Sequence, residues 1–364
     1  MSIRVYSWLI LRGLCPSTPG PKASSNLVKS EQTMCEAPNY SAARVSLDGV
    51  EVVRLTDARH NTQVSVVPTI GNNAFEMKVN GTNVFWTPYG NPAESLAEFR
   101  ARPVHLGNLL LAPWANRLDG DAFWANGRKY LLNAELNNLH RDGNGLPIHG
   151  LLEYSDRWEV VALEATEFGA YLTSRLEFWR HPDYMAQFPF AHAIEITYRL
   201  EDGALDTHMV VTNRAAAVMP LSVAFHPYFT LTDAPRDEWS VRIPARELVV
   251  VDDRLLPTGA REPAGLSDVT PLKDRSFDTV FSGVNAAEEF EVRGRKQRIA
   301  LRFGPKYPVA VVYAPPGRDF ICFEPMSGVT NAFNLAERGL YPQLQTIPPG
   351  GKWEESFRIL PSGF

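Results

Sequence analysis

The strongest constraint on the fold comes from a segment in which apolar and polar residues alternate. From Ile194 to Leu200 every second residue is apolar, and Leu205, Met209 and Val211 lie on one face of the segment that follows. A period of two is the spacing of a β-strand with one buried face. Asp202-Gly203, between the two runs, is a preferred sequence for a tight hairpin turn. The segment therefore predicts an antiparallel hairpin packed on a core.

The rest of the chain from about residue 44 continues in short apolar segments separated by turn residues. Its 28 Pro and 25 Gly in 364 residues make such breaks frequent, which is typical of all-β proteins. Helical patterns are confined to 92–100 and 335–339. Further strands are predicted at 45–55 (two strands around Asp48-Gly49), 63–70, 74–79, 82–86, 121–132, 157–163, 170–179, 218–226, 239–250, 297–304, 309–314 and 320–323.

Residues 1–43 differ in composition from the rest of the chain. The stretch 16–25 is rich in Pro and Ser and has too few apolar residues to build a core. A short apolar run before it resembles an export signal, but Arg12 interrupts the run and no small-residue cleavage site follows closely. We predict a disordered extension over 1–43, with Met34 as an alternative start. One large antiparallel β-sandwich domain is predicted over 44–364.

Charge and cysteine usage exclude several classes of protein. The net charge is -5 with both signs interspersed, so neither nucleic acid nor a membrane is an expected partner. Cys15, Cys35 and Cys322 form no CxxC motif and no zinc-type spacing with histidine, so no metal site is expected. Sparse cysteines indicate free thiols in a reducing compartment, which favours the cytoplasm over export.

Glu324 follows the apolar segment Phe320 to Phe323 and precedes Pro325. Because proline cannot donate to a β-ladder and favours an extended residue before it, we expect Glu324 at the last position of a buried strand. Partial desolvation there raises the pKa of a carboxyl toward the range of a general base. The alternative is a strand-end glutamate that is bonded to backbone amides.

His226 repeats this arrangement, because it closes an apolar segment and is followed by Pro227. A histidine in that setting has a pKa that its surroundings can tune near neutrality. A carboxylate base and a histidine acid at one rim form an acid–base pair. The chain has no nucleophile elbow, P-loop or dinucleotide fingerprint that would indicate other chemistry.

Arg117 lies in the segment 112–120 and is a candidate ligand-binding residue. Its planar group of donors suits a hydroxyl or a carboxylate. The alternative is a surface ion pair with Asp119 or Asp121.

His149 and Asp278 are two further candidates. His149 stands beside Gly150 in an apolar run, so another group can approach closely there. Its alternative is a buried histidine bonded to backbone. Asp278 lies among aromatic residues, and its alternative is an aspartate that caps a loop.

In this order, the segments resemble the aldose 1-epimerase (galactose mutarotase) family over about residues 45–361. The resemblance implies the family's large β-sandwich, a small-molecule sugar such as galactose or glucose as substrate, and neither cofactor nor metal. A monomer or a homodimer is expected. The matching pieces are Asn116-Arg117, 127–133, Ile148-His149-Gly150, 225–229, 252–259, Phe277-Asp278 and Phe323-Glu324-Pro325.

The resemblance also implies a role for each candidate residue. Glu324 is similar to the general base that takes the proton of the anomeric hydroxyl, and His226 to the general acid that protonates the ring oxygen. His149 is similar to a second histidine that hydrogen-bonds the sugar. Contacts with sugar hydroxyls are implied for Asn116, Arg117 and Asp278.

The chain departs from the family pattern at Leu151, where a second glycine is usual, and at Phe225, where Asn is frequent. These changes leave the acid–base pair intact and leave the sugar open. The expected function is an aldose 1-epimerase that interconverts the anomers of a free hexose. One alternative is a hexose-6-phosphate 1-epimerase, with Arg100 and Arg102 as phosphate ligands. Another is a non-catalytic carbohydrate-binding protein of the same fold.

Overall fold

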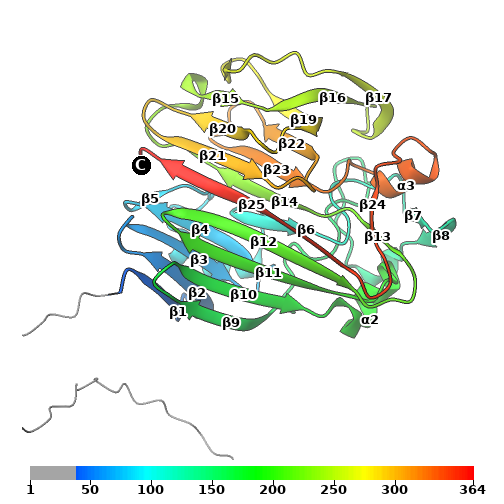
Figure 1. Cartoon of the computed structure of the whole chain (residues 1–364), viewed down its shortest axis with the longest axis horizontal. Coiled ribbons are helices and arrows are strands. Elements are labelled where there is room, and N and C mark those ends of the chain that lie inside the picture. The colour runs from blue at the N-terminus through cyan, green and yellow to red at the C-terminus, as the bar shows by residue number, and fades with distance from the viewer. Residues whose placement is uncertain (1–37) are drawn as a thin grey trace, which may run out of the picture. The chain divides into compact units, whose positions relative to one another are not determined.

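The computed structural model describes residues 38–364, and strands dominate this range (Figure 1). The hairpin expected from the alternating segment is present as β11 (His192–Glu201) and β12 (Ala204–Asn213), which pair in antiparallel register. Asp202 and Gly203 turn the chain with φ of 50° and 72°. Positive φ at both central residues matches the turn to the twist of the strands.

The larger of two main sheets has twelve strands, and its strand pairs are antiparallel. Its strands, in order across the sheet, are β1 (Tyr40–Leu47), β2 (Val50–Asp57), β3 (Thr62–Val67), β4 (Asn73–Val79), β6 (Asn108–Leu111), β14 (Ala224–Phe229), β23 (Ile321–Met326), β22 (Val309–Ala314), β19 (Phe277–Val284), β16 (Ala245–Val251) and β17 (Pro257–Pro263), with β5 (Thr82–Asn83) beside β4.

The second main sheet has nine strands, and Figure 1 shows β9 to β12 and β25 running side by side. Its strands, in order, are β18 (Thr270–Pro271), β15 (Ser240–Arg242), β20 (Glu289–Arg293), β21 (Arg298–Phe303), β25 (Lys352–Ser362), β12, β11, β10 (Ala170–Leu176) and β9 (Glu159–Ala165).

The remaining elements are short. The helix expected over 92–100 is a 3-10 turn followed by α1, and the one expected at 335–339 begins earlier, as α3. No helix within 38–364 has the length and hydropathy to cross a bilayer. These elements are β7 (Ala122–Ala125) with β8 (Arg128–Leu131), β13 (Met219–Leu221) with β24 (Gln345–Ile347), α1 (Leu96–Ala101), α2 (Pro182–Gln187), α3 (Ala332–Glu337), and the 3-10 turns η1 (Pro92–Glu94), η2 (Ala134–Leu136), η3 (Phe178–Arg180) and η4 (Arg236–Glu238).

The inner faces of the two sheets form one core. Phe225 and Phe323 of the larger sheet belong to the same buried cluster as Ile196, Met209 and Phe357 of the smaller sheet. Two sheets packed face to face define a β-sandwich. The predicted all-β antiparallel sandwich is therefore confirmed.

The first strand begins before the predicted start of the domain. The expected extension 1–43 falls outside the described residues as far as Ala37, and so do Met34, Cys15 and Cys35. From Tyr40 onward the chain is part of β1, which pairs with β2 along its whole length.

The prediction that Glu324 and His226 close their strands was wrong, because β23 continues to Met326 and β14 to Phe229. Each strand passes through its proline. The ladder between the two strands is interrupted around these positions, with pairs recorded only on either side. Proline has no N–H to donate, and the interruption is where that loss is tolerated.

Candidate active site

His226 and Glu324 occupy facing positions on the adjacent strands β14 and β23. Ala224 pairs with Met326, and Tyr228 pairs with Cys322. His226 and Glu324 lie midway between these two pairs, so they stand opposite each other. Their neighbours in sequence, Phe225 and Phe323, point into the sandwich core. Because side chains alternate along a strand, His226 and Glu324 both point from the outer face of the larger sheet.

The two side chains are in contact and almost fully buried. His226 Nε2 lies 3.3 Å from Glu324 Oε1, and the residues are 5% and 1% exposed. Glu324 Oε2 and His226 Nδ1 have no hydrogen-bond partner within residues 38–364. A buried acceptor without a partner is costly, so these atoms are available to a ligand.

Burial shifts the titration of both groups away from their charged forms. Loss of solvent raises the pKa of Glu324 well above its ordinary value, Asp278 adds to this, and the charge of Arg117 opposes it. Loss of solvent lowers the pKa of His226 well below its ordinary value, and His105 adds to this. Such perturbed pairs of acid and base are typical of active sites.

His149 reaches the same place from a loop. Its φ of 63° is unusual for a residue with a side chain, and its N–H donates to the carbonyl of Asn116, which has φ of 56°. The space beside Gly150 is occupied by backbone, because a Cβ there would lie 2.1 Å from the carbonyl oxygen of Ala112. The close approach expected at this glycine is therefore made by the protein itself.

Arg117 does not pair with Asp119 or Asp121. Its Nε donates to Asp142 Oδ2 at 2.6 Å, and its Nη1 donates to Asn116 Oδ1 at 3.1 Å. Burial on its own raises the pKa of Asp142, but hydrogen bonds from Arg117 and from two backbone amides lower it overall. The guanidinium is thus fixed in direction.

Asp278, another of the predicted residues, lies in a strand and not in a loop. It sits in β19, opposite Tyr313 of β22. Partial loss of solvent raises the pKa of its carboxyl, and Arg117 opposes the rise. All six predicted residues line one pocket of about 190 Å³, together with His105, Ile148, Tyr228, Val311 and Tyr313.

The sequence did not reveal several of these pocket residues. His105 stands in a loop, between Val104 and Leu106, with no apolar strand before it, and Tyr228 and Tyr313 read as ordinary strand aromatics. Asp142, which holds Arg117, belongs to the polar segment 137–145, which carries no motif typical of a binding site. Only the neighbouring motif His226-Pro227 offered a signal for Tyr228, whose ring stacks on that of His226 at 4.6 Å.

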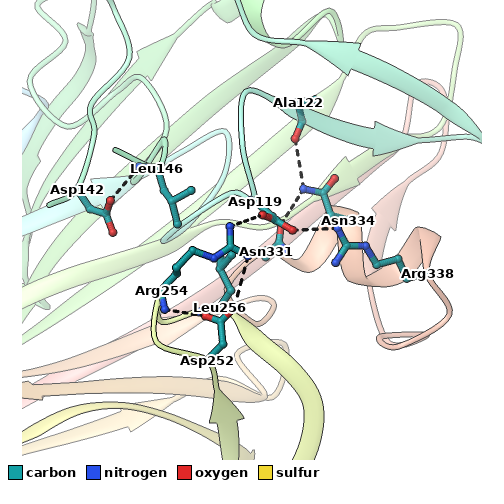
Figure 2. A network of polar contacts seen from close by, with 10 residues as sticks. All are labelled: Asp119, Ala122, Asp142, Leu146, Asp252, Arg254, Leu256, Asn331, Asn334 and Arg338. Carbon is teal, nitrogen blue, oxygen red and sulfur yellow. Dashed lines mark hydrogen bonds and ion pairs between the residues drawn. The ribbon is translucent and has the colours of Figure 1, made fainter. Parts of the chain in front are cut away.

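A polar network joins the strand that bears Glu324 to the loop that bears Arg117. Asn331, in the segment after β23, donates its backbone N–H to the carbonyl of Arg117 and accepts from the N–H of Asp119. Figure 2 shows Asp119 between Arg254 and Arg338, which both pair with it. The network therefore fixes the backbone on both sides of the pocket.

Fold and geometry together define a class of protein: an antiparallel β-sandwich with a small polar pocket on one sheet, floored by a contacting histidine and carboxyl group. Within residues 38–364 no cluster of three or more His, Cys, Asp or Glu side chains is arranged to hold a metal ion. The sequence matches the aldose 1-epimerase family over residues 51–360. The chain belongs to that family.

The chain is also similar to individual proteins and to solved structures. The uncharacterized protein YihR of Escherichia coli is 27% identical over 238 residues, which are 64% of this chain and 72% of YihR. A galactose mutarotase-like protein from Clostridium acetobutylicum has the same fold, with a TM-score of 0.78 at 18% identity over 90% of this chain and 99% of its own. Galactose 1-epimerase from Lactobacillus acidophilus has a TM-score of 0.70 at 16% identity, over 89% of this chain and 100% of its own.

Proposed function

We propose that the protein is an aldose 1-epimerase that interconverts the α and β anomers of a free hexose. The observation that carries the proposal is the contact between His226 and Glu324, two buried titratable groups 3.3 Å apart at the base of a polar pocket. Proton transfer at two neighbouring oxygens is what anomer exchange requires, and such a pair supplies it.

In the proposed reaction Glu324 takes the proton from the hydroxyl on C1 while His226 gives a proton to the ring oxygen O5. The electron pair of the O1–H bond forms the C1 carbonyl, and the C1–O5 bond breaks. Rotation about C1–C2 turns the other face of the carbonyl toward O5. Ring closure with the two proton transfers reversed gives the other anomer and restores both residues.

The proposed cycle needs the charged forms of the pair, whereas burial by itself favours the neutral forms. Hydrogen bonds from sugar hydroxyls to the carboxylate favour its charged form, and Arg117 acts in the same direction. Binding of the sugar is thus coupled to activation of the pair. His149, Asn116, Arg117 and Asp278 are proposed to hold the remaining sugar oxygens.

A free sugar fits the charges of the pocket better than a sugar phosphate. Arg117 is the only lysine or arginine among the described lining residues, and Asp142 already neutralises it. Arg100 and Arg102, the candidate phosphate ligands, are exposed residues at the end of α1 and do not line the pocket. Phosphate recognition normally uses unpaired basic groups.

Polarimetry of freshly dissolved α-galactose and α-glucose tests the proposal, with glucose 6-phosphate measured in parallel by proton NMR. We expect catalytic acceleration with at least one free sugar and a much lower kcat/KM with the phosphate. A faster reaction with the phosphate would favour the sugar-phosphate alternative. Saturable sugar binding without acceleration would favour a non-catalytic binding protein.

A further inference from the structure

The pocket has a second histidine–carboxylate pair beside the one already described. His105 Nε2 lies 3.0 Å from Glu153 Oε1, a close contact whose direction is not that of a hydrogen bond, and His140 Nε2 lies 3.8 Å from the other oxygen. The ring centre of His105 is 5.7 Å from that of His149 and 5.9 Å from that of His226. The His105 side chain is 39% exposed and lines the pocket, whereas the Glu153 side chain is 1% exposed.

The backbone that carries His105 is held from several sides. Asn73, which is fully buried, donates to the carbonyl of Leu106 and accepts from the N–H of Asn108. Between them Gly107 packs so closely that a Cβ there would lie 2.6 Å from a backbone oxygen of β4. The position of the His105 backbone is therefore fixed before any ligand binds.

The backbone of Glu153 is held in a similar way. A Cβ on Gly71 would lie 1.8 Å from the carbonyl oxygen of Glu153, so only glycine allows this contact. The N–H of Gly71 also donates to the carbonyl of Ser155 at 2.9 Å. A carboxyl group buried in this way is expensive to keep in a fold, and its nearest ionisable contacts here are imidazoles.

The contact of Nε2 with Glu153 leaves the other ring nitrogen of His105, Nδ1, for a ligand in the pocket. A carboxylate close to one imidazole nitrogen attracts the ring proton to that nitrogen and so favours one hydrogen-bonding role for the other. Tyr154 supports this orientation, because its ring stacks on that of His105 at 6.2 Å. In the proposed reaction His226 and Glu324 contact the C1 hydroxyl and the ring oxygen, so His105 is placed to contact a different part of the sugar.

We propose that His105 is a substrate-binding residue that discriminates between sugars through one hydroxyl other than the anomeric one, and that Glu153 is its positioning residue. The proposal rests on the function proposed above, since the sugar is the ligand in both. His105 supplies recognition, and the acid–base pair supplies the chemistry. Loss of His105 therefore weakens binding of the sugar more than it slows the chemical step.

The test measures kcat and KM for galactose and for its 2-, 3-, 4- and 6-deoxy derivatives, with wild type, His105→Ala and Glu153→Gln. For galactose we expect His105→Ala to raise KM about 3- to 10-fold, the range of one hydrogen bond, while kcat changes little. One deoxy sugar, which lacks the recognised hydroxyl, should show no further loss in His105→Ala. Glu153→Gln should raise KM in the same direction, and the double variant should be no worse than His105→Ala.

His60→Ala is the matched control. His60 is 38% exposed and pairs with the buried Asp57 at 2.7 Å, yet it does not line the pocket. We expect its KM to equal that of the wild type. A rise in KM of equal size for all five sugars in His105→Ala, or no rise at all, would overturn the proposal for His105 and leave the proposed function in place.

A wild type that does not accelerate anomer exchange would instead refute the proposed function. In that case galactose binding, followed by NMR titration of both proteins, decides the role of His105. Weaker binding to His105→Ala than to wild type and His60→Ala supports the recognition role. Equal binding, or none to any of the proteins, contradicts it.

Discussion

Glu324 is 1% exposed, and its Oε2 has no partner among the described residues. A carboxyl in such a place is more easily protonated than in water, because the charged form loses its hydration. The same burial that suits a proton-transfer group therefore costs stability when the group is ionised. At the scale of single residues, the proposed function and the stability of the fold oppose each other at this position.

The substitution Glu324→Gln separates these two effects. The folded-state pKa of Glu324 is raised above its ordinary value of 4.5, so the wild type loses stability as pH rises from about 4.5 through the folded-state pKa. The variant does not ionise and escapes this loss. Urea unfolding should find it more stable than wild type at pH 8 and similar to it at pH 4. Glu337→Gln, at an exposed residue of α3, should leave the pH dependence unchanged, and a pH-independent effect of Glu324→Gln would contradict the account.

Arg117 owes its orientation to Asp142, whose side chain is 7% exposed. In Asp142→Asn the charged partner is lost, and we expect KM for the sugar to rise about 10-fold or more, as is typical for a hydrogen bond to a charged group. Asp121→Asn is the control, because it removes a similar contact with Arg141 at the surface of the same region. Equal KM values in the two variants would show that the Asp142 contact does not position a binding group.

At the scale of elements, the candidate site depends on loops that are held against the sheet. Gly150 has φ of 71°, and its missing side chain makes room for the carbonyl of Ala112. This contact aligns the segments that carry Asn116 and His149. The loop geometry is thus encoded by backbone packing that only glycine permits.

Gly150→Ala should therefore destabilise the protein by about 2 kcal/mol or more and reduce kcat/KM. Gly127→Ala serves as the control, since Gly127 has φ of 68° but a Cβ added there would meet no atom within 4 Å. Gly127→Ala places a side chain at positive φ but causes no clash. We therefore expect it to lower the free energy of unfolding by about 1 kcal/mol and to leave kcat/KM unchanged. Equal losses of stability in urea unfolding would contradict the packing argument.

Local sequence signals predicted elements well where they reported on backbone geometry. Asp48-Gly49 and Asp202-Gly203 located two hairpin turns, because few other sequences accept positive φ at both positions. Pro227 and Pro325 led to a wrong prediction of where the two strands end. Each strand continues through its proline, at a place where the pairing between the strands is interrupted. The pairing of two strands is decided by residues far apart in sequence, which no local pattern reports.

The site was predictable only in part for the same reason. Glu324 and His226 were recognisable because each is an ionisable residue in an apolar segment. The family resemblance then implied roles for Asn116, Arg117, His149 and Asp278. His105 and Glu153 carry no such local signal, since their contact joins two loops 48 residues apart by their numbering. The alternative ion pair of Arg117 with Asp119 or Asp121 was wrong. These two residues are nearer in sequence, but Asp142 is the carboxylate that contacts Arg117.

At the scale of the whole molecule, the sandwich uses the two faces of its larger sheet for different purposes. The inner face supplies Phe225 and Phe323 to the core, and the outer face presents His226 and Glu324 to the pocket. The strands that carry the pair are almost 100 residues apart along the chain, yet they are neighbours in the sheet. A large core thus supports a small site that contains buried ionisable groups.

The central claim is that the contact between His226 and Glu324 catalyses anomer exchange, and polarimetry of α-galactose with Glu324→Gln tests it most directly. Circular dichroism and urea unfolding first establish that the variant is folded, and Glu337→Gln is assayed beside it. We predict that Glu324→Gln loses about 100-fold or more of the wild-type acceleration, the usual contribution of a general base, while Glu337→Gln keeps it. Full acceleration by folded Glu324→Gln would contradict the account.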